Sequence, residues 1–343
     1  MRARRAGGLV LLGLALGLGG CARQAPSEPP PTPKTPAKAE AKGVPADVIP
    51  TAELDKVAQA AKPVKLALVV KTRNNPFFSP LIAAAEAEAK ALGVALEVQA
   101  PPQESDKEQQ FAMVQTLVAK GIDALLITPA DSKGIVPALK QAQDKGVLVI
   151  NVDNRVDGAT AQAAGLTLGG YVGADNEQGG ERAGQELVKL LSGTGEVGIL
   201  EGIRGADNAE ARKRGCEKAL IGQPKLKLVA TESAEWDTAK AYAKTQAMLA
   251  AHPKLAGLFC SNDKMALGAL KAIDEAGLTG KIAVVGYDNI ADVQPLLKAG
   301  KLKATIEQHP DLMGRYGVKM AVGVLAKSVP AGREHLVTLE VMR

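Results

Sequence analysis

Short apolar runs alternate with longer segments in which apolar residues recur at helical spacing, and this pattern continues from Val64 almost to the C-terminus. The runs predict buried strands and the longer segments predict helices, an alternation typical of βαβ units with right-handed crossovers and a parallel sheet. The predicted strands cover 66–70, 94–98, 124–128, 147–152, 196–200, 226–230, 255–260, 282–285 and 302–306. The predicted helices begin at Pro80 and within 105–108, and then cover 133–144, 177–191, 210–221, 238–251, 264–276, 290–297 and 311–325.

Residues at the expected helix ends support this assignment. Ser79 followed by Pro80 is typical of an N-cap and a first helical position, and 105–108 has the spacing of a capping box. The region from Val64 onward is too long for one ordinary core, so we predict an α/β protein with two similar, doubly wound, parallel-sheet lobes. Glycines follow three of the helical segments, as expected for C-caps: Gly93, Gly121 and Gly146.

Residues 1–20 have the layout of a secretory signal peptide, with a basic head and an apolar segment too short to count as a membrane span. Arg4 and Arg5 form the kind of arginine pair found in twin-arginine signals. The rest of that motif is lacking, which favours the general secretory route. The four residues that end in Cys21 resemble a bacterial lipobox, which implies cleavage before Cys21 and lipid attachment to its thiol. We therefore expect an exported protein that is lipid-anchored to the cell envelope.

Residues 21–63 are rich in proline, alanine, lysine and glutamate. Such a segment buries too little apolar surface to offset its ordering entropy, so we predict an extended tether, with a short helix at 51–62. The formal net charge of the chain is +5, and much of this charge lies in the head and the tether. The charge therefore gives no reason to expect nucleic-acid binding.

Polar and aromatic side chains gather where the predicted strands end. Asn75, Phe77 and Phe78 follow the first strand in a polar loop, although aromatic residues make up only 3% of the chain. Core packing would also explain two rings, but ligands of open α/β sheets bind at strand carboxyl ends, and rings beside amides suit a sugar. With groups at other strand ends and one helix start, these residues would form a cage around a polyol. The additional groups are Thr128, Asp153, Asn154, Arg212, Trp236, Asn262, Asp288 and Gln308.

Several of these residues lie in six short motifs spread over the region from Val64. The motifs are Asn74–Phe78, Leu126–Ser132, Ala211–Gly215, Ser261–Ala269, Val284–Asp288 and Ala304–Gln308. In this order they resemble the ribose-binding protein family of periplasmic sugar-binding proteins, and the motif around Asn262 is highly specific. The resemblance implies a two-lobed type I periplasmic binding protein that delivers a monosaccharide to an ABC importer.

The resemblance also implies which residues contact the sugar. The rings of Phe77 or Phe78 and of Trp236 would sandwich it, and polar groups would bond to its hydroxyls. These polar groups are Asn75, Asp153, Arg212, Asn262, Asp288 and Gln308.

Three positions differ from the ribose binder, which has Asn at Thr128, Arg at Asn154 and Phe at Trp236. Thr128 and Asn154 remain candidate contacts, and Arg155 is an alternative source of the guanidinium. Because a lost donor leaves a sugar hydroxyl unpaired, the ligand is left open between a ribose-like pentose and a hexose.

The same resemblance implies that each lobe is built from separate segments. The N-terminal lobe would comprise 64–173 and 309–334, and the C-terminal lobe 174–308 and 335–343. Three crossovers would then form a hinge. A sugar bound between the lobes would favour the closed state, which the importer would recognise.

Other classes of protein fit these residues less well. Asp153 and Asp288 could serve as a glycosidase acid and base, but Arg212 beside them would keep both ionised, so we expect no enzymatic activity. The glycines around 169–173 lack the spacing of a dinucleotide fingerprint, and turns and close helix packing explain them. A repressor of this fold would need a helix-turn-helix where this chain has a signal peptide.

Cys216 and Cys260 could form a disulfide in an oxidising compartment, but no spacing signal supports it, and two separate buried thiols are favoured. The scattered histidines form no zinc or nucleophile pattern, so we expect no metal and no cofactor. The sequence therefore predicts a monomeric extracytoplasmic binding protein whose partners are a monosaccharide and an ABC permease. Presentation of a sugar or sugar-like signal to a chemoreceptor or histidine kinase is the alternative.

Overall fold

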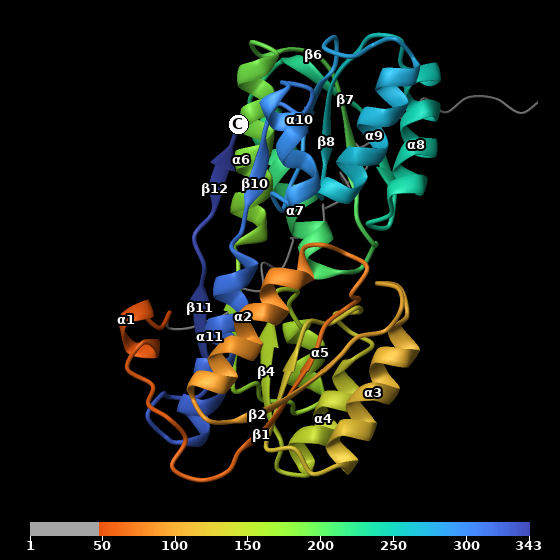
Figure 1. The fold of residues 1–343 in the computed structure, drawn as a ribbon. Coiled ribbons are helices and arrows are strands. Elements are labelled where there is room, and N and C mark those ends of the chain that lie inside the picture. Colours follow the sequence, from red (N-terminus) through yellow and green to blue (C-terminus); the bar gives the residue numbers. More distant parts are fainter. Residues whose placement is uncertain (1–47) are drawn as a thin grey trace, which may run out of the picture. The chain divides into compact units, whose positions relative to one another are not determined.

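The computed structural model describes residues 48–343, so the expected signal peptide, Cys21 and most of the expected tether lie outside the described residues. Within this range two parallel sheets are each flanked by helices (Figure 1). The first sheet has six strands in the order β11-β5-β4-β3-β1-β2, and the second has four in the order β7-β6-β8-β9. A two-stranded antiparallel ribbon pairs β10 with β12. These observations confirm the predicted α/β fold with two lobes and two parallel sheets.

The elements of the first lobe come from both ends of the described chain. Its N-terminal part contains α1 (Thr51–Leu54), β1 (Lys65–Val69), α2 (Phe78–Ala91), β2 (Ala95–Gln99), α3 (Lys107–Ala119), β3 (Ala124–Ile127), α4 (Val136–Asp144), β4 (Leu148–Val152), α5 (Gly158–Ala163) and β5 (Gly170–Gly173). Its C-terminal part contains α11 (Pro310–Leu325) and β11 (Arg333–Leu336).

The elements of the second lobe lie mostly between these two parts. They are α6 (Asn176–Leu190), β6 (Thr194–Glu201), α7 (Asp207–Ile221), β7 (Lys225–Ser233), α8 (Thr238–Ala251), β8 (Leu255–Cys260), α9 (Asp263–Glu275), β9 (Ala283–Val285), η1 (Ala291–Val293), α10 (Gln294–Lys298), β10 (Thr305–Glu307) and β12 (Glu340–Met342). The described chain therefore passes between the lobes three times, after β5, after β10 and after β11.

Strand β1 shows why a continuous apolar run forms a central strand here. It pairs in parallel with β2 on one side and β3 on the other. Leu66 and Leu68 belong to one buried cluster, whereas Ala67 and Val69 belong to a second cluster on the opposite face. Both faces of the strand are thus covered, and the loop that follows the strand lies on the side of the lobe that faces the cleft.

Two predicted helix starts are wrong. Helix α2 begins at Phe78, before Ser79, because the Asn75 side-chain oxygen accepts the Phe77 amide at 3.1 Å and its carbonyl accepts the Phe78 amide at 3.1 Å. The expected capping box is not formed either. The N-cap of α3 is Asp106, whose carboxylate accepts the Gln103 amide instead of capping the helix. The predicted glycine C-caps are confirmed, since Gly93, Gly121 and Gly146 all have positive φ angles.

Strand β5 is not among the predicted strands, because turns and close packing already explain the glycines of its sequence, Gly-Tyr-Val-Gly. A side chain at Gly170 would put its Cβ 2.2 Å from the Met320 sulfur of α11 and 2.9 Å from the Arg333 carbonyl oxygen. Glycine therefore permits α11 and β11 to pack closely on this strand.

The described chain enters the fold along the edge of the first sheet. The Ile49 amide donates to the Glu334 carbonyl of β11 at 2.7 Å, and Nδ1 of His335 lies 3.1 Å from the Ile49 carbonyl oxygen. Helix α1, much shorter than the predicted 51–62, follows, and Asp55 contacts Lys319 of α11 at 3.1 Å. Among residues 48–343, no helix is long and apolar enough to cross a membrane.

Candidate functional site

Loops at the carboxyl ends of strands from both lobes line a cavity that holds about 230 Å³ of empty space, part of which is open to solvent. This position agrees with the rule that ligands of open α/β sheets bind beyond the carboxyl ends of the strands. The first lobe contributes Lys71, Asn75, Phe77, Phe78, Glu104 and Asp153 to the lining. The second lobe contributes Asn208, Arg212, Trp236, Asn262, Asp288 and Gln308.

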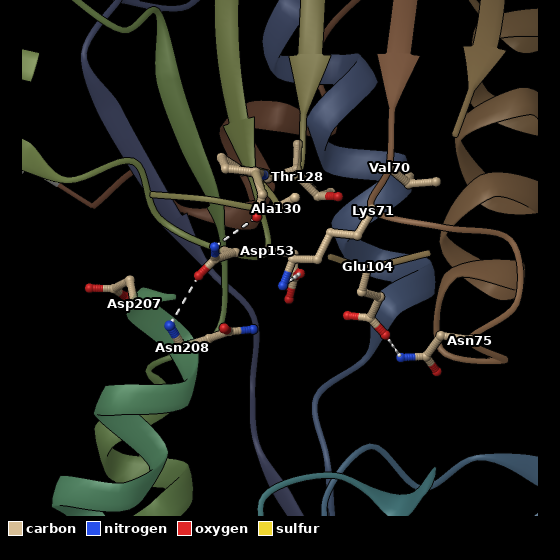
Figure 2. A network of polar contacts seen from close by, with 12 residues as sticks. Val70, Lys71, Asn75, Glu104, Thr128, Ala130, Asp153, Asp207 and Asn208 are labelled. Carbon is tan, nitrogen blue, oxygen red and sulfur yellow. Dashed lines mark hydrogen bonds and ion pairs between the residues drawn. The ribbon is translucent and has the colours of Figure 1, made fainter. Parts of the chain in front are cut away.

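The polar groups of the first lobe are linked in pairs. The Asn75 amide nitrogen donates to Glu104 Oε1 at 2.8 Å, and Lys71 Nζ lies 3.8 Å from Asp153 Oδ2 (Figure 2). Lys71 and Asp153 are both only 2% exposed. Charges this deeply buried are stable only when they are paired or hydrogen-bonded, so these four side chains depend on one another.

Arg212 organises the polar groups of the second lobe. Its Nε donates to Asn176 at 2.8 Å, and its terminal nitrogens donate to the Ser261 carbonyl at 2.9 Å, to Asp288 at 3.4 Å and to Gln308 at 3.2 Å. Gln308 Nε2 also donates to Asp288 Oδ1 at 2.7 Å. The guanidinium therefore fixes an acceptor and an amide at the cavity wall in one hydrogen-bonded array.

Close backbone packing holds Arg212 in this position. Helices α6 and α7 approach so closely that a Cβ at Gly180 would lie 2.0 Å from the Arg212 carbonyl oxygen. This contact agrees with the close helix packing expected for the glycines of this segment.

A buried carboxylate shapes the loop that carries Asp288. Asp263 accepts the Tyr287 amide at 3.0 Å, the Ile290 amide at 3.1 Å and the Thr305 hydroxyl at 2.8 Å. Burial raises the pKa of Asp263 to about 7, against the opposing effect of these hydrogen bonds. Asp263 thus ties the loop on either side of Asp288 to the first residue of β10.

Three lining residues have left-handed backbone conformations, with φ of 61° at Asp153, 64° at Trp236 and 112° at Asp288. Such conformations cost of order 1–3 kcal/mol each for residues other than glycine, least for Asp. Strained residues that converge on one cavity are typical of a functional site.

Aromatic rings line both sides of the cavity. Phe77 and Phe78 of the first lobe form an edge-to-face pair with centroids 5.1 Å apart, and Trp236 lies in the wall of the second lobe. Lys71 Nζ is 5.9 Å and Arg212 Cζ 5.7 Å from the centre of the Trp236 ring. Two cations, one from each lobe, therefore lie close to the indole ring.

Hydrogen-bonding capacity remains unused inside the cavity. Within residues 48–343, Asp153 Oδ1, Asn208 Oδ1 and Trp236 Nε1 are buried and have no hydrogen-bond partner. Buried polar atoms are nearly always paired, so two acceptors and one donor on a cavity wall indicate a polar ligand.

Burial also changes the acidity of the lining carboxyls. It raises the pKa of Asp288 well above its ordinary 3.8, against the charge of Arg212, and raises the pKa of Glu104, against the charge of Lys71. Both carboxylates therefore take up a proton at a higher pH than an exposed carboxylate would.

Comparison with known proteins agrees with this geometry. Residues 66–328 match the sequence model of the periplasmic binding protein domain. The chain belongs to this family. It is a binding protein and not an enzyme, so Asp153 and Asp288 are not a glycosidase acid and base pair.

Relatives in this family include named sugar binders. The D-ribose/D-allose-binding protein of Pseudomonas aeruginosa is 38% identical over 275 residues, which are 80% of this chain and 86% of that protein. The D-allose-binding periplasmic protein of Escherichia coli is 34% identical over 75% of this chain and 83% of its own. A periplasmic solute-binding protein from Actinobacillus succinogenes, solved with bound D-allose, has a TM-score of 0.77 and 38% identity over 81% of this chain and 97% of that chain.

Most of the site residues expected from the sequence lie together in this periplasmic binding protein. The structure places nine of the eleven predicted sugar-binding residues in the cavity lining: Asn75, Phe77, Phe78, Asp153, Arg212, Trp236, Asn262, Asp288 and Gln308.

The structure does not bring the other two candidates, Thr128 and Asn154, to the cavity lining, although both are fully buried. Asn154 bonds instead to the Pro129 carbonyl at 2.8 Å. Arg155, the alternative guanidinium, bonds to Glu334 at 2.6 and 2.9 Å and stacks on Tyr171. None of the three side chains supplies a group to the cavity wall.

Sequence reasoning missed three lining residues, Lys71, Glu104 and Asn208. Lys71 lies just after β1, so the strand-end rule could have found it. Glu104 and Asn208 lie in an irregular segment and at a helix start, and no sequence pattern marks either of them.

The two cysteines of the described chain, Cys216 and Cys260, are free and buried. Burial raises the pKa of both thiols. The favoured prediction of two separate thiols is confirmed, and neither residue takes part in the cavity.

Proposed function

We propose that this protein is a solute-binding protein of an ABC transporter that captures a monosaccharide between its two lobes. The observation that carries the proposal is the cavity lined by both lobes. Two acceptors and one donor that have no partner among the described residues face this cavity together with aromatic rings. The hydroxyls of a sugar can bond to the polar groups, and its C–H faces can pack against the aromatic rings.

The relatives support a single aldose as the ligand. The names of the relatives include ribose and allose, which are an aldopentose and an aldohexose. D-Ribose and D-allose are therefore the first candidates.

Each lobe would supply part of the recognition. Trp236 and the Phe77–Phe78 pair would stack on the faces of the sugar ring, while Asp153 and Asp288 would accept its hydroxyls. Because Asp153 belongs to the first lobe and Asp288 to the second, a sugar bonded to both would favour the closed state by its differential affinity for that state.

The lobe boundaries that we propose are 64–173 with 309–334, and 174–308 with 335–343. The three passages of the chain between the sheets support them, although β11 keeps its pairing with β5 as far as Leu336. The closed arrangement is what the permease would recognise.

Sugar binding should stabilise the protein against unfolding. A ligand at a concentration of 1,000 times its Kd adds about 4 kcal/mol, which a thermal-shift assay detects easily. We expect D-ribose, D-allose or a related aldose to raise the Tm. Maltose, a disaccharide, serves as the control. If no monosaccharide raised the Tm, the proposed function would be wrong.

We further propose that Cys21 carries a lipid anchor. The lipobox-like residues that end at Cys21 support this, and they lie outside the described residues. The Cys21→Ser variant should move from the membrane fraction to the soluble fraction of the cell envelope, as measured by fractionation and immunoblotting. Retention of the variant in the membrane fraction would contradict the anchor.

A further inference from the structure

Helix α7 differs from the other long helices of its lobe in the way its N-terminus is capped. Its N-cap is Ala206, which has no side-chain acceptor. In each of the other three helices the N-cap side chain accepts a backbone amide at 2.9 Å: Asp175 for α6, Asp237 for α8 and Asn262 for α9. The first amides of α7 therefore need acceptors from elsewhere.

These acceptors come from the opposite lobe. The Asp207 amide donates to the Ser132 hydroxyl oxygen at 3.0 Å, and the Asn208 amide donates to Asn154 Oδ1 at 3.0 Å. Figure 2 shows Asn208 at the start of α7, with a dashed line to the facing carboxamide. Ser132 and Asn154 are 2% and 0% exposed, so water does not compete for these bonds in this closed arrangement.

The two acceptors are held in place within the first lobe. Asn154 Nδ2 donates to the Pro129 carbonyl at 2.8 Å and to the Ser132 hydroxyl at 3.3 Å. The Asn154 carbonyl in turn accepts from Asn151 Nδ2 at 2.7 Å. Because none of these supporting contacts involves the second lobe, the acceptors would keep their positions when the lobes separate.

The capped end of α7 also reaches the cavity. The side chain of Asn208 lines the cavity, and its Oδ1 is buried without a partner among the described residues. Arg212 lies one turn further along the same helix. One helix end therefore contacts the opposite lobe through its backbone and faces the ligand space through its side chains.

We propose that Ser132 and Asn154 are positioning residues that cap α7 across the cleft when the lobes close, while the Asn208 carboxamide contacts the sugar. This inference rests on the proposed function and adds to it. Ser132 and Asn154 stabilise the closed state whatever sugar is bound, so they act on affinity and not on selectivity. Asn208 meets the sugar itself, so it acts on selectivity.

Affinities for several sugars separate these roles. Ser132→Ala and Asn154→Ala should each raise Kd about 5-fold, the factor expected for a lost capping bond. The factor should be the same for every sugar that binds. Asn208→Ala should instead change the ratio of the Kd values between sugars. Ser132→Thr, which keeps the hydroxyl, should have the Kd of the wild type. Asp157→Ala, which removes the cap of α5 within the first lobe, should leave Kd unchanged.

Amide hydrogen exchange tests the cap at its own atoms. In the sugar-saturated protein, Ser132→Ala should speed exchange of the Asp207 amide, and Asn154→Ala should speed exchange of the Asn208 amide, each about 5-fold. The Lys240 amide, which is capped by Asp237 within its own lobe, should not change and serves as the reference.

The outcomes distinguish this inference from the proposed function. A wild-type protein that binds no sugar contradicts the proposed function. A wild-type protein that binds, with unchanged Kd and exchange rates in both Ala variants, contradicts the cap alone. If no sugar binds, the closed fraction of the ligand-free protein, measured by energy transfer between dyes at Lys145→Cys and Lys271→Cys, still tests the cap. That fraction should fall in the double Ala variant, and an equal fraction would overturn the inference.

Discussion

The Asp288→Asn variant is expected to bind its sugar roughly 30- to 5,000-fold more weakly than the wild type, a loss of about 2–5 kcal/mol. The variant loses the charge that faces Arg212 at 3.4 Å. Its amide oxygen can still accept from Gln308, but an amide nitrogen, which accepts no hydrogen bond, replaces the second carboxylate oxygen. Arg212 would then remain buried next to a neutral amide, with its charge only partly compensated. Isothermal titration calorimetry measures the change in Kd.

Two further measurements show whether the carboxylate of Asp288 is the cause. Asp292→Asn changes an exposed carboxylate of the same lobe and should leave the affinity unchanged. The wild-type affinity should fall as the pH is lowered, beginning above pH 3.8, because burial raises the pKa of Asp288 and binding needs the ionised form. In Asp288→Asn this dependence should shrink to the part contributed by two other buried carboxyls with raised pKa values, Glu104 and Asp263. Equal pH profiles for variant and wild type would rule out a titrating Asp288.

Replacing Lys71 by methionine should weaken binding by about 3–5 kcal/mol, or roughly 150- to 5,000-fold. Methionine keeps most of the apolar stem but removes the charge, which leaves Asp153 and Glu104 buried at the cavity without their cation. The closed state suffers most, because solvent screens the same carboxylates when the lobes are apart. Calorimetry with the best-binding aldose gives the loss in affinity.

The sign of a pH effect distinguishes this charge effect from simple loss of packing. The Lys71 charge lowers the pKa of Glu104, so its removal should raise that pKa further and move the loss of affinity to a higher pH. Lys145→Met, at an exposed position of the same lobe, is the matched control. A Lys71→Met protein with wild-type affinity would show that the buried cation plays no part in binding.

The sequence predicts the strands well where burial on both faces leaves a continuous apolar run. Strand β8 and helix α8 were placed with the bounds that the structure has, at Leu255–Cys260 and Thr238–Ala251. The sequence pattern does not reveal strands β5 and β11, because contacts with residues distant in the chain determine which residues they contain. Gly170 of β5 leaves room for the Met320 side chain, and β11 is a polar edge strand that pairs with β5.

The candidate site was predictable to the extent that it follows one rule, that polar groups at the ends of parallel strands converge. This rule and the motif resemblance together place Asp153, Asn262 and Asp288 at the same cavity. They do not tell which of two adjacent residues faces the cleft. Asp153 lines the cavity, whereas the side chain of Asn154, the next residue, accepts the Asn208 amide at the start of α7 in the other lobe. That choice depends on the left-handed backbone at Asp153, which no local pattern announces.

The entry of the described chain along β11 has a mechanical consequence. Ile49 and α1 are fastened to β11 and α11, which both belong to the first lobe. A force applied to the chain before Val48 would therefore act on that lobe and not on the three segments that connect the lobes. If Cys21 carries the proposed lipid anchor, the anchor would hold the first lobe and leave the second free to close on the sugar, so anchoring would not oppose binding.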